Sequence, residues 1–216
     1  MSARENILAR IRAANAVAKS SVALGGGPEL RISEHPRGPH PDLSWDALQK
    51  FIDQSRASAS SVDQIDRIED LPTAVSKYLT ENALEKRLVG WDDYQSLDWA
   101  SAGLEMEARP AQGSDKVGVT GSFCAIAETG TLVTLSGEFS PATTSLLPET
   151  HIAVLRTSRI VKTMEDAWSL VRQEVGDLPR QVNFISGPSR TADIEMTLVY
   201  GAHGPFRVHV ILLNDE

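Results

Sequence analysis

Short, nearly continuous apolar segments recur through the second half of this 216-residue chain. They fall near residues 117–119, 132–135, 152–155, 182–185 and 208–213. A strand that is buried on both faces has this character, because neither face needs polar side chains. The segments therefore predict a mostly parallel sheet that is covered by helices on both sides, which is an α/β fold.

Helical patterns lie between and before these segments. In the first half, apolar residues recur at helical spacing at Leu48, Phe51 and Ile52, and again at Val75, Tyr78 and Leu79. Short strands are expected near Val62 and at residues 88–91. The best-marked helix begins at Thr163, whose hydroxyl can cap the backbone N–H of Asp166, and it ends at Gly176. These helices supply the layers that cover the predicted sheet.

The first 43 residues have the character of an extension. Ile7, Leu8 and Ile11 recur at helical spacing among arginines, which predicts an amphipathic helix. Glycine and proline are frequent in residues 20–43, which predicts an extended linker. Residues 44–216 are then expected to form a single α/β domain. The pattern favours a helix that docks on the body or on a second subunit; a mitochondrial transit peptide is the alternative.

Composition excludes several classes of function. The 21 basic and 29 acidic residues give a net charge of −8, which opposes binding to nucleic acid or anionic lipid. The longest apolar runs, such as residues 210–213, are far shorter than the roughly 18 residues of a membrane span. Cys124 is the one cysteine, so this chain can form no internal disulfide and no four-thiolate zinc or iron–sulfur site. We therefore expect a cytoplasmic protein with no metal or cofactor of its own.

A candidate anion site follows the segment at 182–185. Residues 186–191 place a strand end and a Gly-Pro turn before a helix that is expected to run over 193–200. Free N–H groups at a helix N-terminus attract anions, and Arg190 can add a charge-assisted bond worth about 1.5–3 kcal/mol. The combination suits a carboxylate or a phosphate. The structural alternative is that these polar residues only cap the helix while Arg190 pairs with a surface acid.

A second polar turn lies between two apolar segments, at residues 127–131. Glu128 is a candidate catalytic carboxylate there, although a glutamate in a turn is more often simply solvated. Thr129 and Thr131 flank it across Gly130, so the carboxylate can accept hydrogen bonds and organise the turn.

A third polar loop supplies the second catalytic candidate, His203. Gly201, Gly204 and Pro205 fix a tight loop that aims this imidazole in one direction, where it can donate a proton or pair with an anion. No paired metal-ligand spacing accompanies it, so no metal is predicted. His209 lies in an apolar strand, which is typical of a buried core histidine. The anion-binding candidates of the three loops are Thr129, Gly130, Thr131, Gly187, Ser189, Arg190, Thr191, Asp193 and Gly204.

Five motifs in this order resemble the lactate-utilisation protein C family, part of the wider group called the LUD domain. The motifs lie at residues 118–120 (Gly-Val-Thr), 126–131 (Ile-Ala-Glu-Thr-Gly-Thr), 147–152 (Leu-Pro-x-x-His-Ile), 186–195 (Ser-Gly-Pro-Ser-Arg-Thr-Ala-Asp-Ile-Glu) and 201–205 (Gly-x-His-Gly-Pro). The resemblance covers about residues 117–213 strongly, while the N-terminal half matches only in general layout.

The resemblance implies a three-layer α/β/α fold similar to the ribose-phosphate isomerase and CoA-transferase group. It also implies work in a multi-component system that oxidises L-lactate to pyruvate, in which sister subunits carry the iron–sulfur centres. The single Cys124 fits that division of labour.

Two classes of function remain open. In the first, the chain is a binding or assembly subunit that holds a small carboxylate or a sister subunit and does no chemistry itself. The acidic charge, the single cysteine and the amphipathic N-terminal helix favour this class. In the second, it is an acyl-transfer or isomerase-type enzyme, because residues 128–130 resemble the Glu-x-Gly turn of CoA-transferases, whose carboxylate is a nucleophile.

Overall fold

The computed structural model describes residues 4–12, 35, 37–38, 41–194 and 197–215. The chain divides into two compact units, Met1–Pro41 and Asp42–Glu216. In the first unit residues 4–12 are helical, as the spacing predicts, and Ile7, Leu8 and Ile11 are exposed on this helix. Most of the linker expected over 20–43 lies outside the described residues.

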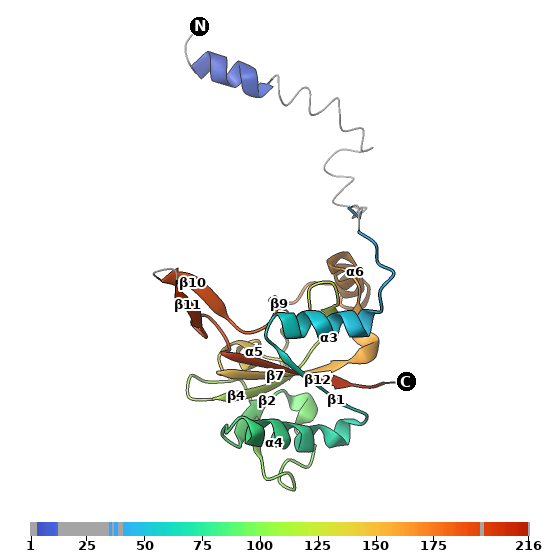
Figure 1. Ribbon diagram of the computed structural model, residues 1–216, viewed down its shortest axis with the longest axis vertical. Helices are drawn as coiled ribbons and strands as arrows, with labels where there is room; N and C mark the ends of the chain where they lie inside the picture. The colour runs from blue at the N-terminus through green and yellow to red at the C-terminus, as the bar shows by residue number, and fades with distance from the viewer. Residues whose placement is uncertain (1–3, 13–34, 36, 39–40, 195–196, 216) are drawn as a thin grey trace. The chain divides into compact units, whose positions relative to one another are not determined.

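A parallel sheet forms the centre of the second unit (Figure 1). Its strand order is β1 (Ser61–Ile65), β12 (Arg207–Leu213), β7 (Thr150–Arg156), β4 (Val117–Gly121), β2 (Arg87–Gly90) and β3 (Glu105–Ala108). Every neighbouring pair in this order is parallel. The mostly parallel sheet predicted from the apolar segments is confirmed.

Both faces of the parallel sheet are buried, which explains the nearly continuous apolar strands. On β7, Ile152 and Val154 join the core cluster that includes α4 (Leu71–Glu81). Ala153 and Leu155 alternate with them and join the cluster that includes α3 (Ala47–Ala57). Helices thus flank the sheet on both faces, as expected, with α4 and α3 on opposite sides in Figure 1.

Two of the predicted strands belong to a second sheet instead. Its order is β8 (Ile160–Val161), β5 (Cys124–Ile126), β6 (Thr131–Leu135) and β9 (Val182–Ile185), and β6 pairs antiparallel with both of its neighbours. The expectation that segments 132–135 and 182–185 join the parallel sheet was wrong. They look alike in sequence because this sheet is also buried on both faces: Leu132 faces the α3 cluster, whereas Val133 faces α6 (Met164–Glu174).

The capping box at the start of α6 forms as the sequence predicts. The Thr163 hydroxyl accepts the backbone N–H of Asp166, while the Asp166 carboxylate accepts the backbone N–H of Thr163. Gly176, just beyond the helix, has a φ of 70°, which suits its role as the stop. The short helix α5 (Thr143–Leu146) and three 3₁₀ turns, η1 (Ile68–Asp70), η2 (Asp92–Tyr94) and η3 (Thr157–Arg159), complete the described elements.

The helix predicted over 193–200 is absent, and a β-hairpin takes its place. β10 (Arg190–Ile194) pairs antiparallel with β11 (Thr197–Tyr200), and the hairpin projects from the body in Figure 1. Thr191 lies opposite Val199, so β-branched residues pair across the two strands. An eight-residue helix is only marginally stable in isolation, and strand pairing is favoured here.

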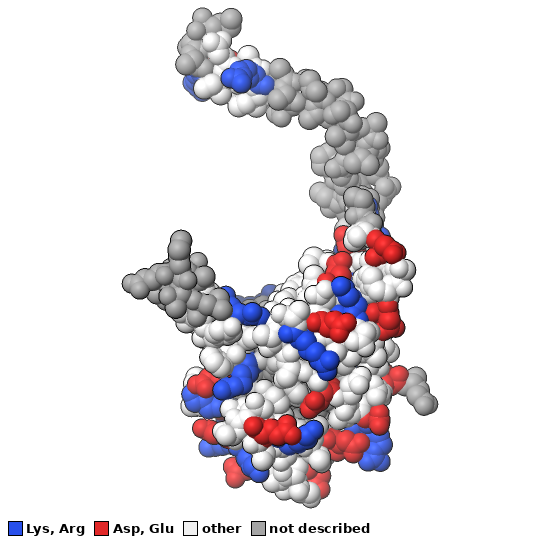
Figure 2. Space-filling model, in the orientation of Figure 1, with Lys and Arg blue, Asp and Glu red and all other residues white. Residues whose placement is uncertain are grey.

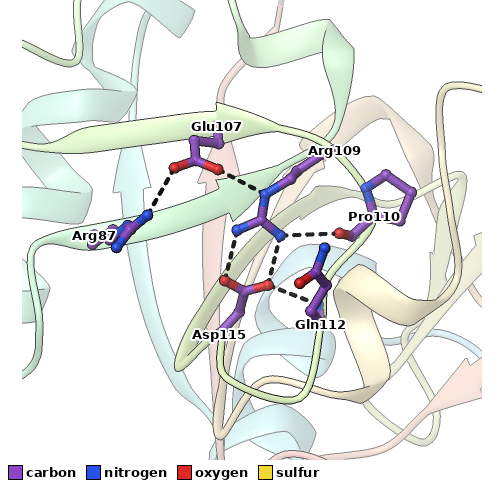
Figure 3. A network of polar contacts seen from close by, with 6 residues as sticks. All are labelled: Arg87, Glu107, Arg109, Pro110, Gln112 and Asp115. Carbon is purple, nitrogen blue, oxygen red and sulfur yellow. Dashed lines mark hydrogen bonds and ion pairs between the residues drawn. The ribbon is translucent and has the colours of Figure 1, made fainter.

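An ion-pair network joins the edge strand β3 to the loop that follows it (Figure 3). Arg109 makes a bidentate pair with Asp115, at 2.7 and 2.8 Å, and also donates to Glu107 at 2.7 Å. Arg87 on β2 donates to the other oxygen of Glu107 at 3.1 Å. The network therefore ties the last strand of the sheet to its neighbour and to the returning chain.

Candidate functional site

Two of the three predicted loops lie together at the amino edge of the parallel sheet. The backbone N–H of Ser189 donates to the carbonyl of Pro205 at 2.9 Å. The Ser189 hydroxyl accepts the backbone N–H of His203 at 3.2 Å. Gly204 lies beside Ser189, because a Cβ at this position would be 3.5 Å from Ser189 Cβ, an ordinary van der Waals contact. Residues 187–191 and 203–205 therefore form one polar surface.

The turn at 129–131 joins them through a chain of hydroxyls. Thr129 Oγ1 lies 2.6 Å from Thr131 Oγ1, which lies 2.7 Å from Ser186 Oγ. Gly130 has a φ of 64° and packs on the end of α3, where a Cβ would lie 2.5 Å from Ser55 N. Gly187 has a φ of 76° and leaves no room for a Cβ against the carbonyl of Ser58. These two glycines allow the loops to close on the helix.

Arg190 lies in this cluster, but not at a helix N-terminus. Its guanidinium donates to the carbonyl of Ser58, and its Cζ lies 5.9 Å from the centre of the Tyr200 ring. Because Arg190 begins strand β10, the helix field that was expected to attract an anion is missing. If residues 187–191 bind an anion, the attraction comes from the charge of Arg190 and from the loop hydroxyls alone. The side chain of Asp193 lies outside the described residues.

Glu128 points to a different partner from the one expected. Its Oε1 accepts the backbone N–H of Met164, the first residue of α6, at 3.1 Å. Thr129 and Thr131 bond to each other and to Ser186 instead of to this carboxylate. Glu128 therefore serves as an acceptor for an N–H group that has no partner inside the helix.

The two histidines differ in setting. The side chain of His203 is exposed at the loop surface. His209 is buried as expected: its Nδ1 lies 2.8 Å from Ser61 Oγ, and its ring stacks on Tyr78 with centroids 3.9 Å apart. Burial lowers the pKa of His209 to about 4. His209 is thus a neutral core residue at pH 7, and His203 alone of the two is accessible for a proton transfer.

A hollow of about 390 Å³ opens beside these loops, and its rim carries aromatic and arginine side chains. Tyr200 and Phe206 are 41% and 45% exposed, and their rings lie 5.8 Å apart. Arg190 approaches the first ring and Arg207 the second, whose centre is 4.8 Å from Arg207 Cζ. Exposed aromatic rings that are paired with arginine are typical of protein–protein interfaces.

Cys124 is fully buried in the cluster between the second sheet and α6. Burial raises the pKa of its thiol to about 11, against the opposing charge of Arg159. A buried thiol of this kind is a poor nucleophile and a poor metal ligand. Within residues 4–12, 35, 37–38, 41–194 and 197–215, no three His, Cys, Asp or Glu side chains gather as a metal site. The helices of this described part are also too short or too polar to cross a membrane.

The surface of the body carries charges of both signs. On the face shown in Figure 2, acidic and basic side chains are interspersed over the described part of the body. A mixed surface of this kind gives a polyanion no continuous track on that face.

A second cavity, which the sequence patterns did not indicate, lies at the opposite edge of the parallel sheet. It measures about 470 Å³ and lies where β2, β4, β7 and β12 end. Its described lining is Ile68, Trp91, Asp93, Tyr94, Gly121, Ser122, Phe123, Leu135, Ser140, Val154, Arg156 and Leu213. Ligands in open α/β sheets bind at the carboxyl ends of the strands. The polar residues that follow the strands ending at Gly90 and Gly121 were the signal that could have located it.

Comparison with known proteins gives one family and one related fold. The family described as LUD domain matches residues 48–213. The Lactate utilization protein C of Bacillus licheniformis is 40% identical over 123 residues, which covers 55% of this chain and 50% of the relative. The protein of the same name from Bacillus subtilis is 39% identical over 131 residues, which covers 55% of each. The matched part of this chain thus spans about half the length of these curated relatives.

A crystal structure of a DUF162 family protein from Deinococcus radiodurans has the same fold. It superposes with a TM-score of 0.57 at 23% sequence identity, and the match covers 77% of this chain and 96% of that protein.

Proposed function

This chain belongs to the LUD domain family, and we propose that it is a cytoplasmic component of lactate utilisation that docks a sister subunit. The proposal takes its system from the relatives named Lactate utilization protein C, which are about 40% identical. We propose that this system oxidises L-lactate to pyruvate and that its iron–sulfur centres belong to sister subunits, as the resemblance of the motifs implies. This chain binds a small carboxylate or a partner and carries no cluster itself.

One observation supports the docking role: exposed aromatic and arginine side chains lie close together at the edge where the polar loops 187–191 and 203–205 meet. Tyr200 and Phe206 are each more than 40% exposed, and each has an arginine against its ring. Rings and guanidinium groups contribute most of the binding energy in many interfaces. We propose that a sister subunit covers this surface, which we define as Arg190, Tyr200, Phe206 and Arg207.

Of the predicted ligand residues, Arg190 belongs to this surface, and we propose a ligand-binding role for the set as a whole. Thr129, Gly130, Thr131, Gly187, Ser189, Arg190, Thr191, Asp193 and Gly204 are the residues in question. A carboxylate held here would be bound by the charge of Arg190 and by loop hydroxyls, without a helix field. His203, exposed in the neighbouring loop, is then the nearest candidate for a proton donor.

The alternative, an acyl-transfer enzyme that uses Glu128, has less support. One carboxylate oxygen already accepts the Met164 N–H, so attack on an acyl group would compete with the end of α6 for the same side chain. Cys124, the other possible nucleophile, is fully buried.

Co-purification tests the proposal. A tagged chain that is co-expressed with the proposed cysteine-rich sister subunits is expected to retain them, and Phe206→Ser is expected to reduce that retention at least tenfold. Phe139→Ser is the matched control, because Phe139 is 60% exposed but lies on the loop after β6, away from the docking surface. Equal retention by both variants would contradict the docking role.

Spectroscopy tests the division of labour. The purified chain is expected to be colourless and to oxidise no lactate alone, because one cysteine cannot hold a cluster. A co-purifying visible spectrum that bleaches with lactate would show that the chain carries redox chemistry itself.

A further inference from the structure

The cavity at the carboxyl edge has the position and size of a ligand site. Trp91 follows β2, Gly121 ends β4, Arg156 ends β7 and Leu213 ends β12, and all four line the cavity. Its volume, about 470 Å³, exceeds what lactate needs and falls within the range of about 300–1,000 Å³ that is usual for small-molecule pockets. A ligand that fills it has a body larger than three carbons.

One wall of the cavity is aromatic, and Gly121 makes room for it. A Cβ at Gly121 would lie 2.9 Å from Tyr94 Oη and 3.3 Å from Trp91 Cζ3, so a larger residue would displace the two rings that pack on the end of β4. The indole of Trp91 is fixed by its hydrogen bond to the carbonyl of Pro141, at 3.2 Å. Phe123 extends the wall. This surface suits a flat or branched apolar group.

The other lining groups are polar and of opposite charge. Among the described residues of the lining, Arg156 is the one cation and Asp93 the one anion. Arg156 Nη1 lies 3.9 Å from Asp215 Oδ2, a loose pair, whereas that carboxylate is bonded closely by the hydroxyl and backbone N–H of Ser158. The guanidinium can therefore bind an anion without separating from Asp215.

Two further groups have hydrogen-bonding capacity. The carboxylate of Asp93 is exposed and can accept a hydrogen bond from a hydroxyl group. Ser122, also on the lining, has a buried hydroxyl without a partner in the described chain, and such groups are rare in native proteins.

We propose that this cavity binds a 2-hydroxy carboxylate with an aromatic or branched apolar side chain. Arg156 binds the carboxylate, and Asp93 accepts a hydrogen bond from the 2-hydroxyl. The apolar group lies against the wall formed by Trp91, Tyr94 and Phe123. This binding site is formed only by the lining of the cavity, so it is independent of the docking surface at the opposite edge.

Calorimetry with four probes separates these contributions. Phenyllactate carries the carboxylate, the hydroxyl and the ring, while lactate lacks the ring. 3-Phenylpropionate lacks the hydroxyl, and 3-phenylpropane-1,2-diol lacks the charge. Phenyllactate is expected to bind the full chain at least tenfold more tightly than each of the others. No measurable binding of phenyllactate, or binding of the neutral diol with equal affinity, would overturn the proposal.

Variants locate the site. Arg156→Gln is expected to weaken phenyllactate binding at least tenfold. Arg172→Gln, at an exposed position of α6 outside the cavity lining, should change the affinity less than twofold. Asp93→Ala is expected to remove the preference for phenyllactate over 3-phenylpropionate, because alanine leaves no side-chain acceptor for the 2-hydroxyl. Because Arg156→Gln could disturb folding, the indole N–H resonances of the native chain provide a second measurement. Phenyllactate should shift the Trp91 resonance and leave that of Trp45 in place; the reverse pattern, or equal affinity in Arg156→Gln and the native chain, would refute the assignment.

Discussion

The carboxylate of Glu128 accepts the backbone N–H of Met164 at 3.1 Å, across 36 residues of sequence. This bond joins the turn after β5 to the first residue of α6. A negative charge at a helix N-terminus is favourable by about 0.3–1 kcal/mol. Glu128 therefore has a structural role, as the sequence suggests, but its partner is the start of a distant helix and not the neighbouring threonines.

We predict that Glu128→Gln folds normally and supports most of the lactate-dependent activity of the reconstituted system. The amide oxygen of glutamine can accept the same N–H, so only the charge is lost. A loss of about 1 kcal/mol or less in the free energy of unfolding is expected. Urea denaturation and lactate-dependent dye reduction are the measurements.

A nucleophilic Glu128 would give the opposite pattern. Glutamine cannot form the acyl intermediate, so turnover would fall by several powers of ten while the fold stayed intact. An acyl or CoA adduct found on Glu128 by mass spectrometry after incubation with acyl-CoA would establish the enzyme alternative.

The capping box gives a second prediction. Thr163 is fully buried, and its hydroxyl accepts the Asp166 N–H at 3.2 Å. Thr163→Ala should lower the free energy of unfolding by about 0.5–2 kcal/mol, because an N–H at the start of α6 loses its acceptor. Thr163→Ser keeps the hydroxyl and is the control. Equal losses in the two variants would show that packing of the methyl group, and not capping, is responsible.

Local patterns in the sequence predict local structure well in this protein. The helix between Thr163 and Gly176 forms as expected, because its cap and its stop are each set by neighbouring residues. The apolar strands also form where predicted. The neighbours of each strand could not be predicted from the sequence, because strand pairing depends on residues that are far apart in the chain. Leu132, for example, lies opposite Ile185 in an antiparallel pair and not in the parallel sheet.

The errors at the site have the same physical origin. Over 193–200 the polar and β-branched residues suit a hairpin as well as a helix, and the pairing of Thr191 with Val199 favours the hairpin. The cavity at the carboxyl edge was missed because Trp91, Gly121 and Arg156 meet only when three parallel strands end side by side. The sequence did place Ser189 and His203 in loops that come together.

The edge network gives a third prediction. Arg109 and Asp115 are 28% and 14% exposed, so their bidentate pair is shielded from solvent more than most ion pairs. Arg109→Gln and Asp115→Asn should each destabilise the fold by about 1 kcal/mol, and the double variant by less than the sum. Urea unfolding of the four proteins gives the coupling energy.

An exposed pair in the same protein is the control for that cycle. Arg67 and Asp70 lie 3.1 Å apart but are 69% and 46% exposed. Their coupling should be at most about 0.5 kcal/mol, because solvent screens the charges. A coupling energy between Arg109 and Asp115 no larger than this would mean that the network stabilises the sheet edge no more than an exposed ion pair does.

The buried histidines give the last prediction, which concerns pH. Burial lowers the pKa of His151 from 6.5 to about 4, and the same cause lowers the pKa of His209 to about 4 against the opposing charge of Asp63. Between pH 6.5 and 4 the unfolded chain therefore binds protons that the native chain does not. Stability should be fully present above pH 6.5 and fall as the pH drops toward 4, by roughly 3 kcal/mol for each group at most. Below pH 4 the native histidines also bind protons, so this contribution changes no further.

The slope of stability against pH tests this assignment, whatever the absolute stability of the variants. Urea denaturation of the native chain between pH 7 and 4.5 should show the decline. His151→Gln and His209→Gln should each flatten it by about 2 kcal/mol over that range, because neither glutamine binds a proton. His151→Gln can still bond to Thr120, whose hydroxyl lies 2.8 Å from His151 Nε2, so folding should survive the change. An unchanged slope in both variants would show that carboxylates, and not these two imidazoles, set the acid limit of the fold.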